Sequence, residues 1–276
     1  MAGKTRGRGG LRDRLLVKPG STVNLADVDP NETLGHVKVT AEVKVAADLE
    51  HLTSLQERLW AEHRHRVLMV LQGIDASGKD GTITHVMRAF NPLGCRVVGF
   101  GVPNPVELAH DYLWRVHQVV PGNGEISVFN RSHYEAVLVE RVHSLVPQEV
   151  WSRRYDQINA FEQMLVEEGT TILKFFLHID RDEQKRRLQA RVSNPTKRWK
   201  FKMGDLAERK LWADYLAAFN EALMRCSTEQ APWFVIPANH NWFRNLAVGD
   251  IAAASLDALD PKYPPGEQIP KDLKIE

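Results

Sequence analysis

Short apolar runs alternate with amphipathic segments along most of the chain. The runs predict buried β-strands, at residues 67–71, 96–100, 126–129, 172–179 and 233–236. The segments that separate them predict helices, at residues 81–90, 106–119, 133–145, 147–168, 181–191, 204–225 and 242–259. Strands that alternate with helices are typical of βαβ units, so we expect an α/β fold with a parallel sheet flanked by helices. Ligands bind such a sheet at the carboxyl ends of its strands.

The part of the chain before the first strand divides at about residue 40. Residues 1–40 are expected to form a partly irregular N-terminal extension that begins as a basic, solvated arm. A helix is expected over residues 41–63, because Val and Leu recur there on one helical face. No break in composition follows, so residues 41–276 are expected to form one domain. The basic arm lacks an apolar core and does not predict a secretory signal.

The first strand runs into a Gly-rich turn, Gly73-Ile-Asp-Ala-Ser-Gly78-Lys79, and a helix follows the turn. Strand, Gly-x-x-x-x-Gly-Lys and helix together indicate a Walker A P-loop, whose backbone N–H groups hold phosphate. We expect Lys79 to act as the catalytic cation. The residues expected to line the phosphate site are Gly73, Ala76, Ser77, Gly78, Asp80, Gly81 and Thr82. The competing interpretation, a Gly-rich turn with incidental charges, is disfavoured by the flanking strand and helix.

Two carboxylates distinguish this loop from the ordinary motif. Asp80 stands where Ser or Thr usually binds Mg²⁺, and Asp75 lies inside the loop. A carboxylate beside bound phosphate repels it unless a metal or a proton lies between them. We therefore expect Asp75 to contact Mg²⁺ or to face a group that it activates.

A second polar segment, Asn130-Arg-Ser-His-Tyr-Glu135, follows the strand predicted at 126–129. A strand end of this kind is where P-loop enzymes make a further Mg²⁺ contact. Asn130 adds no charge there, and Glu135, one helical turn later, can supply it. Asp75 and Glu135 are therefore the expected metal ligands. The alternative is that Asn130 or Ser132 caps the next helix, which does not exclude a place in the site.

The strongest concentration of charge lies between residues 185 and 202, a run with eight Lys and Arg and no acidic residue. Its loop, near residues 193–203, is expected to act as a lid that closes over a phosphate chain through Lys197, Arg198 and Lys200. The alternative is a solvated basic face, as most charge runs are.

Composition limits the classes of function. The chain has 276 residues and a net charge of +1, so no global field indicates nucleic-acid binding. The two cysteines, Cys95 and Cys226, have no metal-type spacing, and we expect no disulfide and a reducing, cytoplasmic location. No apolar run approaches the roughly 20 residues that span a bilayer, so no membrane partner is expected.

Several motifs together resemble the family-2 polyphosphate kinases. They are Gly73-x-Asp75-x-x-Gly78-Lys79-x-Gly81, His110-Asp-Tyr-Leu-Trp-Arg-Val-His117, Asn130-Arg-Ser-His-Tyr-Glu135 with Glu140-Arg141-Val142, and Lys197-Arg-Trp-Lys-Phe201. The resemblance extends in consistent order from about residue 40 to residue 260. It implies a thymidylate-kinase-like P-loop NTPase fold, with inorganic polyphosphate as the phosphoryl donor, a nucleotide as the acceptor and Mg²⁺, or Mn²⁺, as the cofactor.

The pattern around Asn130 is similar to the class III branch, which uses both AMP and ADP; many family members have Asp at this position. We therefore expect reversible transfer that forms ADP and ATP, with guanine nucleotides as further candidate substrates. In this scheme Asp75, Lys79, Asn130, Arg131 and Glu135 are catalytic. Arg141 is expected to join Arg131 in offsetting phosphate charge. A homo-oligomer, a dimer or a tetramer, is also expected.

Two other functions are compatible with a P-loop. One is an ATP-dependent nucleoside monophosphate kinase, which shares the fold and the loop. The other is a non-catalytic regulator that binds a nucleotide or holds RNA on the basic loop. The presence of Asp75 and Lys79 and the nearly neutral net charge disfavour the regulator.

Overall fold

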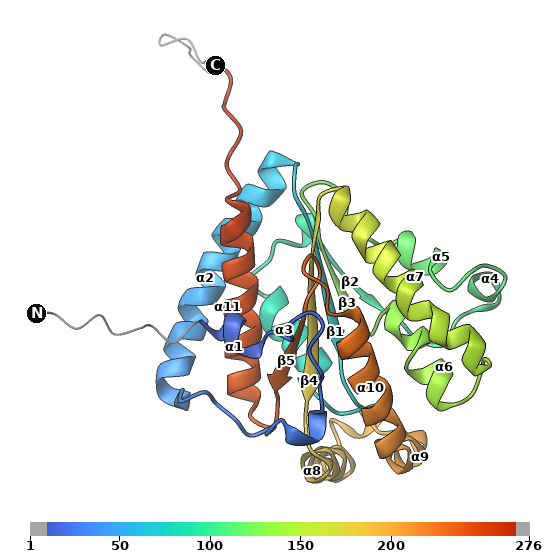
Figure 1. Cartoon of the computed structure of the whole chain (residues 1–276). Helices are drawn as coiled ribbons and strands as arrows, with labels where there is room; N and C mark the ends of the chain where they lie inside the picture. The colour runs from blue at the N-terminus through green and yellow to red at the C-terminus, as the bar shows by residue number, and fades with distance from the viewer. Residues whose placement is uncertain (1–9, 269–276) are drawn as a thin grey trace, which may run out of the picture.

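Five parallel strands form the centre of the protein, in a computed structural model that describes residues 10–268 (Figure 1). The strands are β1 (Arg66–Gln72), β2 (Cys95–Gly99), β3 (Ile126–Asn130), β4 (Thr170–His178) and β5 (Trp233–Pro237). Their order across the sheet is β2-β3-β1-β4-β5, and every neighbouring pair is parallel. The expected α/β fold with a parallel sheet is confirmed, and each strand lies within two residues of its predicted start.

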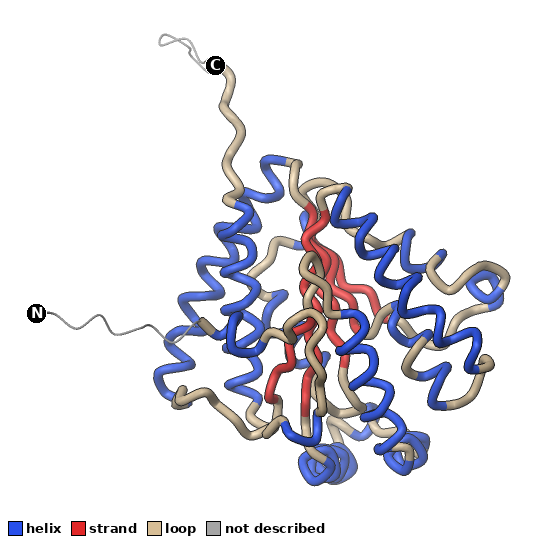
Figure 2. Tube along the Cα trace, viewed as in Figure 1, coloured by secondary structure: helices blue, strands red, loops and turns tan. Residues whose placement is uncertain are grey.

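Helices cover both faces of the sheet, as the blue tubes around the red strands in Figure 2 show. One face packs against α1 (Leu11–Leu15), α2 (Lys38–Glu62), α3 (Lys79–Met87) and α11 (Asn241–Leu259). The other face packs against α6 (Val139–Val142), α7 (Gln148–Glu167) and α10 (Trp212–Cys226). Helices α8 (Arg181–Ser193) and α9 (Gly204–Lys210) lie beyond the carboxyl ends of the strands.

Side chains of β1 alternate between these two cores. Val67, Met69 and Leu71 belong to the core under α2, α3 and α11, whereas Leu68 and Val70 belong to the core under α7 and α10. A strand that is buried on both faces must be apolar at successive positions, because neighbouring side chains point to opposite faces. This requirement explains why the run reads as continuously apolar in the sequence.

Three of the predicted helices are interrupted. The segment expected at 106–119 forms α4 (Pro105–Leu108) and α5 (Trp114–His117), because the Asp111 carboxylate accepts a hydrogen bond from the Leu113 N–H and makes a local turn (2.9 Å). The segment at 133–145 begins as the 3₁₀ helix η3 (His133–Ala136) and then continues as α6. The segment at 204–225 divides into α9 and α10 at Leu211.

Residues before α2 pack on the edge of the sheet. Leu11, Leu15 and Leu25 are buried, and the Val17 N–H donates to the Trp233 carbonyl of β5 (2.8 Å). Loop-rich sequence therefore still contributes to both cores. The basic arm at residues 1–9 lies outside the described residues, and the division into an extension and a domain stays a prediction.

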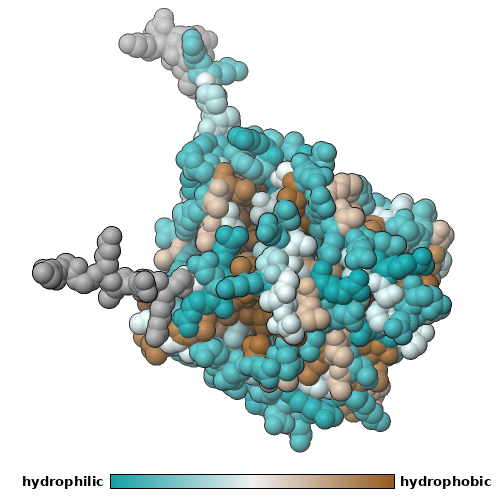
Figure 3. Space-filling view, in the orientation of Figure 1, coloured by the Kyte–Doolittle hydropathy of each residue, from teal (hydrophilic) through white to brown (hydrophobic). Residues whose placement is uncertain are grey.

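The outer surface is mostly hydrophilic on the face drawn in Figure 3, where hydrophobic patches are separated by polar side chains. Within residues 10–268, no helix is both long enough and apolar enough to cross a membrane. Cys95 and Cys226 are both free thiols.

The strand order fixes where a ligand can bind. The chain leaves β1 toward one edge of the sheet and leaves β3 toward the other, so the crevice between these neighbours is the topological switch point. Leu71 of β1 and Asn130 of β3 are register partners at the carboxyl ends. The P-loop follows the first of these strand ends, and the segment that starts at Asn130 follows the second.

Candidate functional site

The turn between β1 and α3 has the backbone of a phosphate-binding loop. Gly73 and Gly78 have positive φ angles, 152° and 105°. A Cβ at Gly78 would lie 2.1 Å from the Arg244 guanidinium, so only glycine fits there. The first residues of α3 line the cavity that this turn borders, and the first N–H groups of a helix have no acceptor within it. These features support the assignment of residues 73–79 as a P-loop.

Lys79 is held at the centre of the loop. Its amine donates to the Gly73 carbonyl (2.7 Å) and to the Ile74 carbonyl (3.4 Å), and the side chain is buried. Burial and the nearby Arg131 charge lower the pKa of Lys79 to about 8, against the opposing effect of Asp75, Glu135 and Asp80. Phosphate at this point would favour the charged amine.

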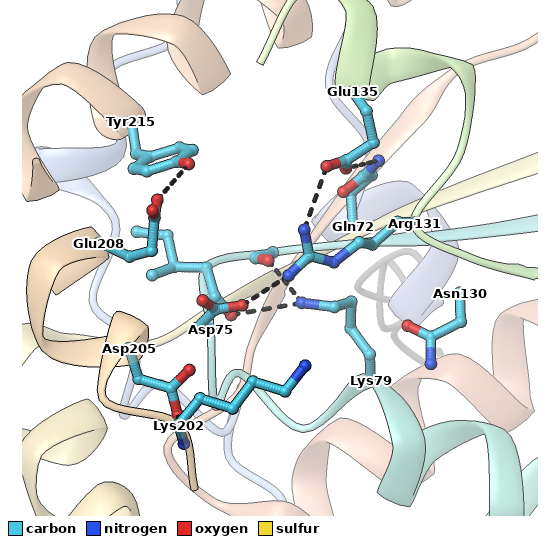
Figure 4. Close-up of polar contacts among 12 residues, drawn as sticks. Gln72, Asp75, Lys79, Asn130, Arg131, Glu135, Lys202, Asp205, Glu208 and Tyr215 are labelled. Atoms are coloured by element: carbon cyan, nitrogen blue, oxygen red, sulfur yellow. Dashed lines mark hydrogen bonds and ion pairs between the residues drawn. The ribbon is translucent and has the colours of Figure 1, made fainter. Parts of the chain in front are cut away.

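Arg131 connects the two strand ends, as Figure 4 shows. Its guanidinium pairs with Asp75 of the P-loop (2.8 Å) and with Glu135 of η3 (3.2 Å). Gln72, the last residue of β1, donates to the other oxygen of Glu135 (3.1 Å). Burial alone would lower the pKa of Arg131, but Glu135 and Asp75 raise it above its ordinary value. The structure thus brings together Asp75, Lys79, Arg131 and Glu135, as expected from the sequence.

The backbone at Arg131 is unusual. Arg131 has a φ of 64°, a left-handed conformation that is rare for a residue with a Cβ. Ser132 follows and caps η3 by accepting the Tyr134 N–H (3.2 Å). Of the two capping candidates, Ser132 is the one that caps. Asn130 instead donates from its side chain to the Asp80 carboxylate (2.9 Å).

A buried polar network lies behind this segment and could not be read from the sequence. The Lys174 amine of β4 donates to the Tyr134 hydroxyl (2.9 Å) and pairs with Glu162 of α7, which also contacts His133 (3.1 Å). All four side chains are buried. Because buried charges are stable only when they are paired, this network fixes η3 against β4 and α7.

The P-loop borders a cavity of about 800 Å³ whose lining is mainly cationic. Its acidic residues are Asp75, Asp80 and Asp205. Its cationic residues are Lys79, Arg131, Arg186, Arg187, Arg191, Lys197, Lys200, Lys202 and Arg244. Ala76, Ser77, Gly78 and Gly81 complete the wall on the P-loop side. Such a lining can hold a polyanion by offsetting its charge.

A smaller cavity of about 280 Å³ adjoins the first and shares Asp75, Arg131, Lys202 and Asp205 with it. Apolar side chains line part of its wall, among them Ile74, Leu138, Val139 and Phe219. Glu208 lies at its edge, where it accepts from the Tyr215 hydroxyl (2.6 Å) and contacts His143 (3.0 Å). Burial, together with this bond to Glu208, raises the pKa of Tyr215. The three polar residues of this group come from α9, α10 and the end of α6, and no local pattern marked them.

The basic segment expected as a lid borders the larger cavity. Lys197 and Lys200 line it, and the Lys200 amine lies 3.4 Å from an Asp80 oxygen. Burial would raise the pKa of Asp80, but the hydrogen bond from Asn130 and the charge of Lys200 lower it. Lys202 also faces the cavity, and Figure 4 shows its side chain extending toward Asp75 and Lys79.

Three residues assigned to the site from sequence line neither of these two cavities. Arg198 donates to the Val192 carbonyl at the end of α8 (2.8 Å) and does not line the larger cavity. Arg141 pairs with Glu221 of α10 (2.6 Å), which already offsets its charge. Thr82 is buried in α3, where its hydroxyl donates to the Gly78 carbonyl (3.2 Å).

Two arginines that the sequence assignment did not include support the P-loop from behind. Arg187 of α8 donates to the Ala76 carbonyl (3.0 Å) and the Ser77 carbonyl (2.8 Å). Arg244, in the first turn of α11, packs against Gly78. Arg187 lies within the basic run, which was a usable signal; Arg244 is an isolated arginine in a helix.

Oxygen ligands for a metal ion are limited to a few carboxylates. Within residues 10–268, no group of three or more His, Cys, Asp or Glu is arranged to hold a metal ion. Mg²⁺ usually takes only one or two protein carboxylates and completes its shell with water and substrate phosphates. Asp75 and Glu135, which converge on Arg131 beside the P-loop, provide such a pair.

Comparisons with known proteins agree with the geometry. A family model described as "Polyphosphate kinase 2 (PPK2)" matches residues 37–264. The AMP/ADP-polyphosphate phosphotransferase of Meiothermus ruber is 53% identical over 262 residues, which cover 94% of this chain and 98% of the relative. The ADP-polyphosphate phosphotransferase of Rhodopseudomonas palustris is 42% identical over 228 residues, which cover 78% of this chain and 79% of the relative.

A solved structure is also similar over nearly its whole length. The crystal structure of polyphosphate kinase 2 from Arthrobacter aurescens TC1 has a TM-score of 0.91 and 42% sequence identity, and the match covers 95% of this chain and 94% of that one. The overall fold of this chain is therefore one that occurs in an experimental structure.

Proposed function

The chain belongs to the polyphosphate kinase 2 family, and from that premise we propose that it transfers phosphoryl groups from inorganic polyphosphate to AMP and to ADP. The products are ADP and ATP, and the transfer is reversible. One observation carries the proposal: a cationic cavity at the P-loop shares the wall formed by Asp75, Arg131, Lys202 and Asp205 with a smaller, partly apolar cavity. Two anionic substrates can meet across that wall.

The larger cavity suits the donor. Polyphosphate carries a negative charge on every phosphate and no apolar group, and the charged residues of the cavity lining are nine Lys and Arg against three Asp. Backbone N–H groups of the P-loop and the Lys79 amine hold the phosphates next to the reacting end. Lys197 and Lys200 border the same cavity and can neutralise phosphates from the lid side.

The smaller cavity suits the nucleoside part of the acceptor. Its apolar side chains provide a surface for a base, and the Glu208, Tyr215 and His143 group offers hydrogen bonds to a sugar or a base. The acceptor phosphate would then lie at the shared wall, beside Arg131 and Lys202.

The reaction needs positioning more than a strong base. A terminal phosphate oxygen of AMP or ADP, already ionised at neutral pH, attacks the end phosphorus of the polyphosphate. The new P–O bond forms as the bridging P–O bond to the rest of the chain breaks, and the shortened polyphosphate leaves with the electron pair. Lys79 and Arg131 offset charge on the transferring group, and Asp75 orients the attacking phosphate.

The donor set fits Mg²⁺, with Mn²⁺ as a substitute of similar ligand preference. Asp75 and Glu135 would hold the ion, and Asn130 would complete the shell through its amide oxygen or a water. Held there, the ion would supply positive charge that offsets the charge developing on the transferring phosphate. Both carboxylates pair here with Arg131. The positive charge of Arg131 can also pair with a phosphate.

A donor exchange tests this function against an ATP-dependent monophosphate kinase. The protein is incubated with AMP and Mg²⁺, once with polyphosphate and once with ATP as the donor, and the nucleotides are separated by chromatography. We expect ADP from polyphosphate with no ATP added. ADP formed only when ATP is supplied would contradict the proposal. Use of guanine nucleotides, a homo-oligomeric state and a cytoplasmic location stay predictions.

A further inference from the structure

Arg244 is a buried cation without an acidic partner. Its side chain is 4% exposed, and within residues 10–268 no carboxylate lies within ion-pair distance of its guanidinium. The acceptors that it reaches are neutral amide oxygens, Asn241 Oδ1 (2.8 Å) and Asn245 Oδ1 (2.9 and 3.2 Å). A charge removed from water in this way is costly unless an anion compensates it.

Lys79 shares this lack of an acidic partner, whereas two cations elsewhere in the described part of the chain, the buried Lys174 and the half-buried Arg187, are paired. Lys174 pairs with Glu162 in the network behind η3, and Arg187 pairs with Glu183 of α8. Arg187 adds to the charge beside Arg244, because its own guanidinium lies against the same glycine, Gly78. Burial and the Arg187 charge lower the pKa of Arg244 to about 10, so it remains protonated at neutral pH.

Arg244 lies on the P-loop itself. A Cβ built on Gly78 would come within 2.1 Å of its guanidinium, and one on Gly81 within 3.3 Å. Gly78 and Gly81 are three positions apart and share one side of the first turn of α3. The same residue lines the large cationic cavity. The absence of side chains at both glycines therefore leaves room for the guanidinium beside this turn, in the wall of the cavity that a ligand held on the turn would occupy.

The reacting centre lies on a different part of the same turn. Lys79 faces the Gly73 and Ile74 carbonyls beside Asp75 and Arg131, whereas Arg244 approaches from α11. A phosphate held by Arg244 is consequently not the one that is transferred. It lies further along a chain whose end is at Lys79.

We propose that Arg244 is a binding site for inner phosphates of the polyphosphate donor, and that it makes the protein favour donors long enough to reach it. This inference rests on the proposed function, because it assumes that the donor occupies the P-loop cavity. The ligand class is a linear chain of phosphates with at least one charged unit beyond those at Lys79. The anionic partner that no carboxylate of residues 10–268 provides for Arg244 is then supplied by the substrate.

The test compares tripolyphosphate with long-chain polyphosphate in wild type, Arg244→Gln and Arg244→Lys. Loss of one charge-assisted contact should raise the KM for long-chain polyphosphate roughly tenfold to hundredfold in Arg244→Gln. The KM for AMP should stay within about twofold, and the KM for tripolyphosphate should change less than that for the long chain. Arg244→Lys keeps the charge and should recover part of the loss.

Arg225→Gln is the matched control, since it removes one arginine charge that pairs with Asp156 away from both cavities. An equal rise in the KM for both donors and for AMP would contradict the proposal, and would mean that Arg244 only supports the P-loop backbone. An unchanged KM for the long chain would contradict it as well. If Arg244→Gln does not fold, the KM values of Arg244→Lys for long-chain polyphosphate, tripolyphosphate and AMP are compared with those of wild type in the same way. Absence of polyphosphate turnover in wild type would instead reject the proposed function.

Discussion

Lys79 combines two properties that are normally opposed, a buried position and a charge-dependent task. Its amine is satisfied by loop carbonyls alone, and burial holds its pKa near 8 rather than 10.5. The Lys79 amine of the free protein is therefore only partly protonated slightly above neutral pH, and a bound phosphate stabilises its charged form. Binding of polyphosphate and protonation of Lys79 should favour each other.

This coupling predicts a pH dependence. As pH rises through about 8, the amine of the free protein loses its proton and the KM for polyphosphate should increase. The kcat at saturating polyphosphate should change less, because bound phosphate raises the pKa of the amine. Steady-state kinetics from about pH 7 to about pH 9 measure both. An arginine at this position stays charged throughout this range, so Lys79→Arg should remove the increase in the KM for polyphosphate. A wild-type KM that does not change over this range would contradict the assignment of Lys79 as the phosphate-binding cation.

Asp75, which we propose as a Mg²⁺ ligand, also forms an ion pair with Arg131. It shares Arg131 with Glu135, and Asp75→Asn removes one charge of that group without changing its size. We expect the Mg²⁺ concentration for half-maximal activity to rise by about tenfold to hundredfold and the binding of AMP, measured by calorimetry, to change little. Asp156→Asn, an exposed carboxylate paired with Arg225, is the control. Equal damage to AMP binding and Mg²⁺ dependence would show that Asp75 is only structural.

At the scale of elements, the basic segment after α8 acts through selected side chains. Lys197 and Lys200 line the cavity, whereas Arg198 turns back to the end of α8. The charge run predicted a lid near residues 193–203; this segment borders the P-loop cavity, and its closing over a phosphate chain stays a prediction. The sequence could not tell which side chains point inward, because that depends on the 3₁₀ turn Arg198–Lys200.

Charge reversal in this segment should act on the donor. Lys200→Glu places a negative charge beside Asp80 and should raise the KM for polyphosphate about tenfold or more, with a smaller effect on AMP. Lys210→Glu, an exposed change at the end of α9, should have little effect. The KM for polyphosphate should also rise with salt in wild type, since a polyanion releases counterions on binding. Equal loss for both substrates, or a KM insensitive to salt, would contradict the lid.

The segment before α2 is part of the folded core in spite of its Pro and Gly content. Leu25 is 1% exposed, and its N–H donates to the Asn220 side chain of α10 (2.9 Å). Leu25→Ala should lower the free energy of unfolding by about 2–4 kcal/mol through the lost burial and the cavity left behind. Val39→Ala, at a position 76% exposed, should stay within about 0.5 kcal/mol. Chemical denaturation measures the free energy of unfolding of both variants. An effect of Leu25→Ala as small as that of Val39→Ala would mean that the segment before α2 is not part of the core.

At the scale of the whole molecule, the parallel sheet and the centre of the site could be predicted because local patterns report them. Asp75, Lys79, Arg131 and Glu135 follow the ends of β1 and β3, and adjacent strands place their carboxyl ends together. The part of the smaller cavity that Glu208 and Tyr215 line could not be predicted, because the tertiary packing of α9 and α10 brings these residues to the site.

Arg141 and Arg244 show that a motif in the sequence does not decide which arginine reaches the site. Arg141 lies in a motif of the family, yet its charge is taken up by Glu221. Arg244 lies in no motif that we recognised, yet it packs on the P-loop glycine Gly78. Sequence position indicates which residue types are present, whereas the pairing of charges is decided by helices that are distant in the chain.

The central claim is that one site phosphorylates both AMP and ADP with polyphosphate. The most direct measurement is a time course in one vessel that contains the protein, AMP, polyphosphate and Mg²⁺ but no ATP, with AMP, ADP and ATP resolved by chromatography. We expect that ADP forms first and that ATP follows at the expense of ADP. A reaction that stops at ADP would contradict the use of both acceptors, and no phosphorylation of either nucleotide by polyphosphate would contradict the function itself.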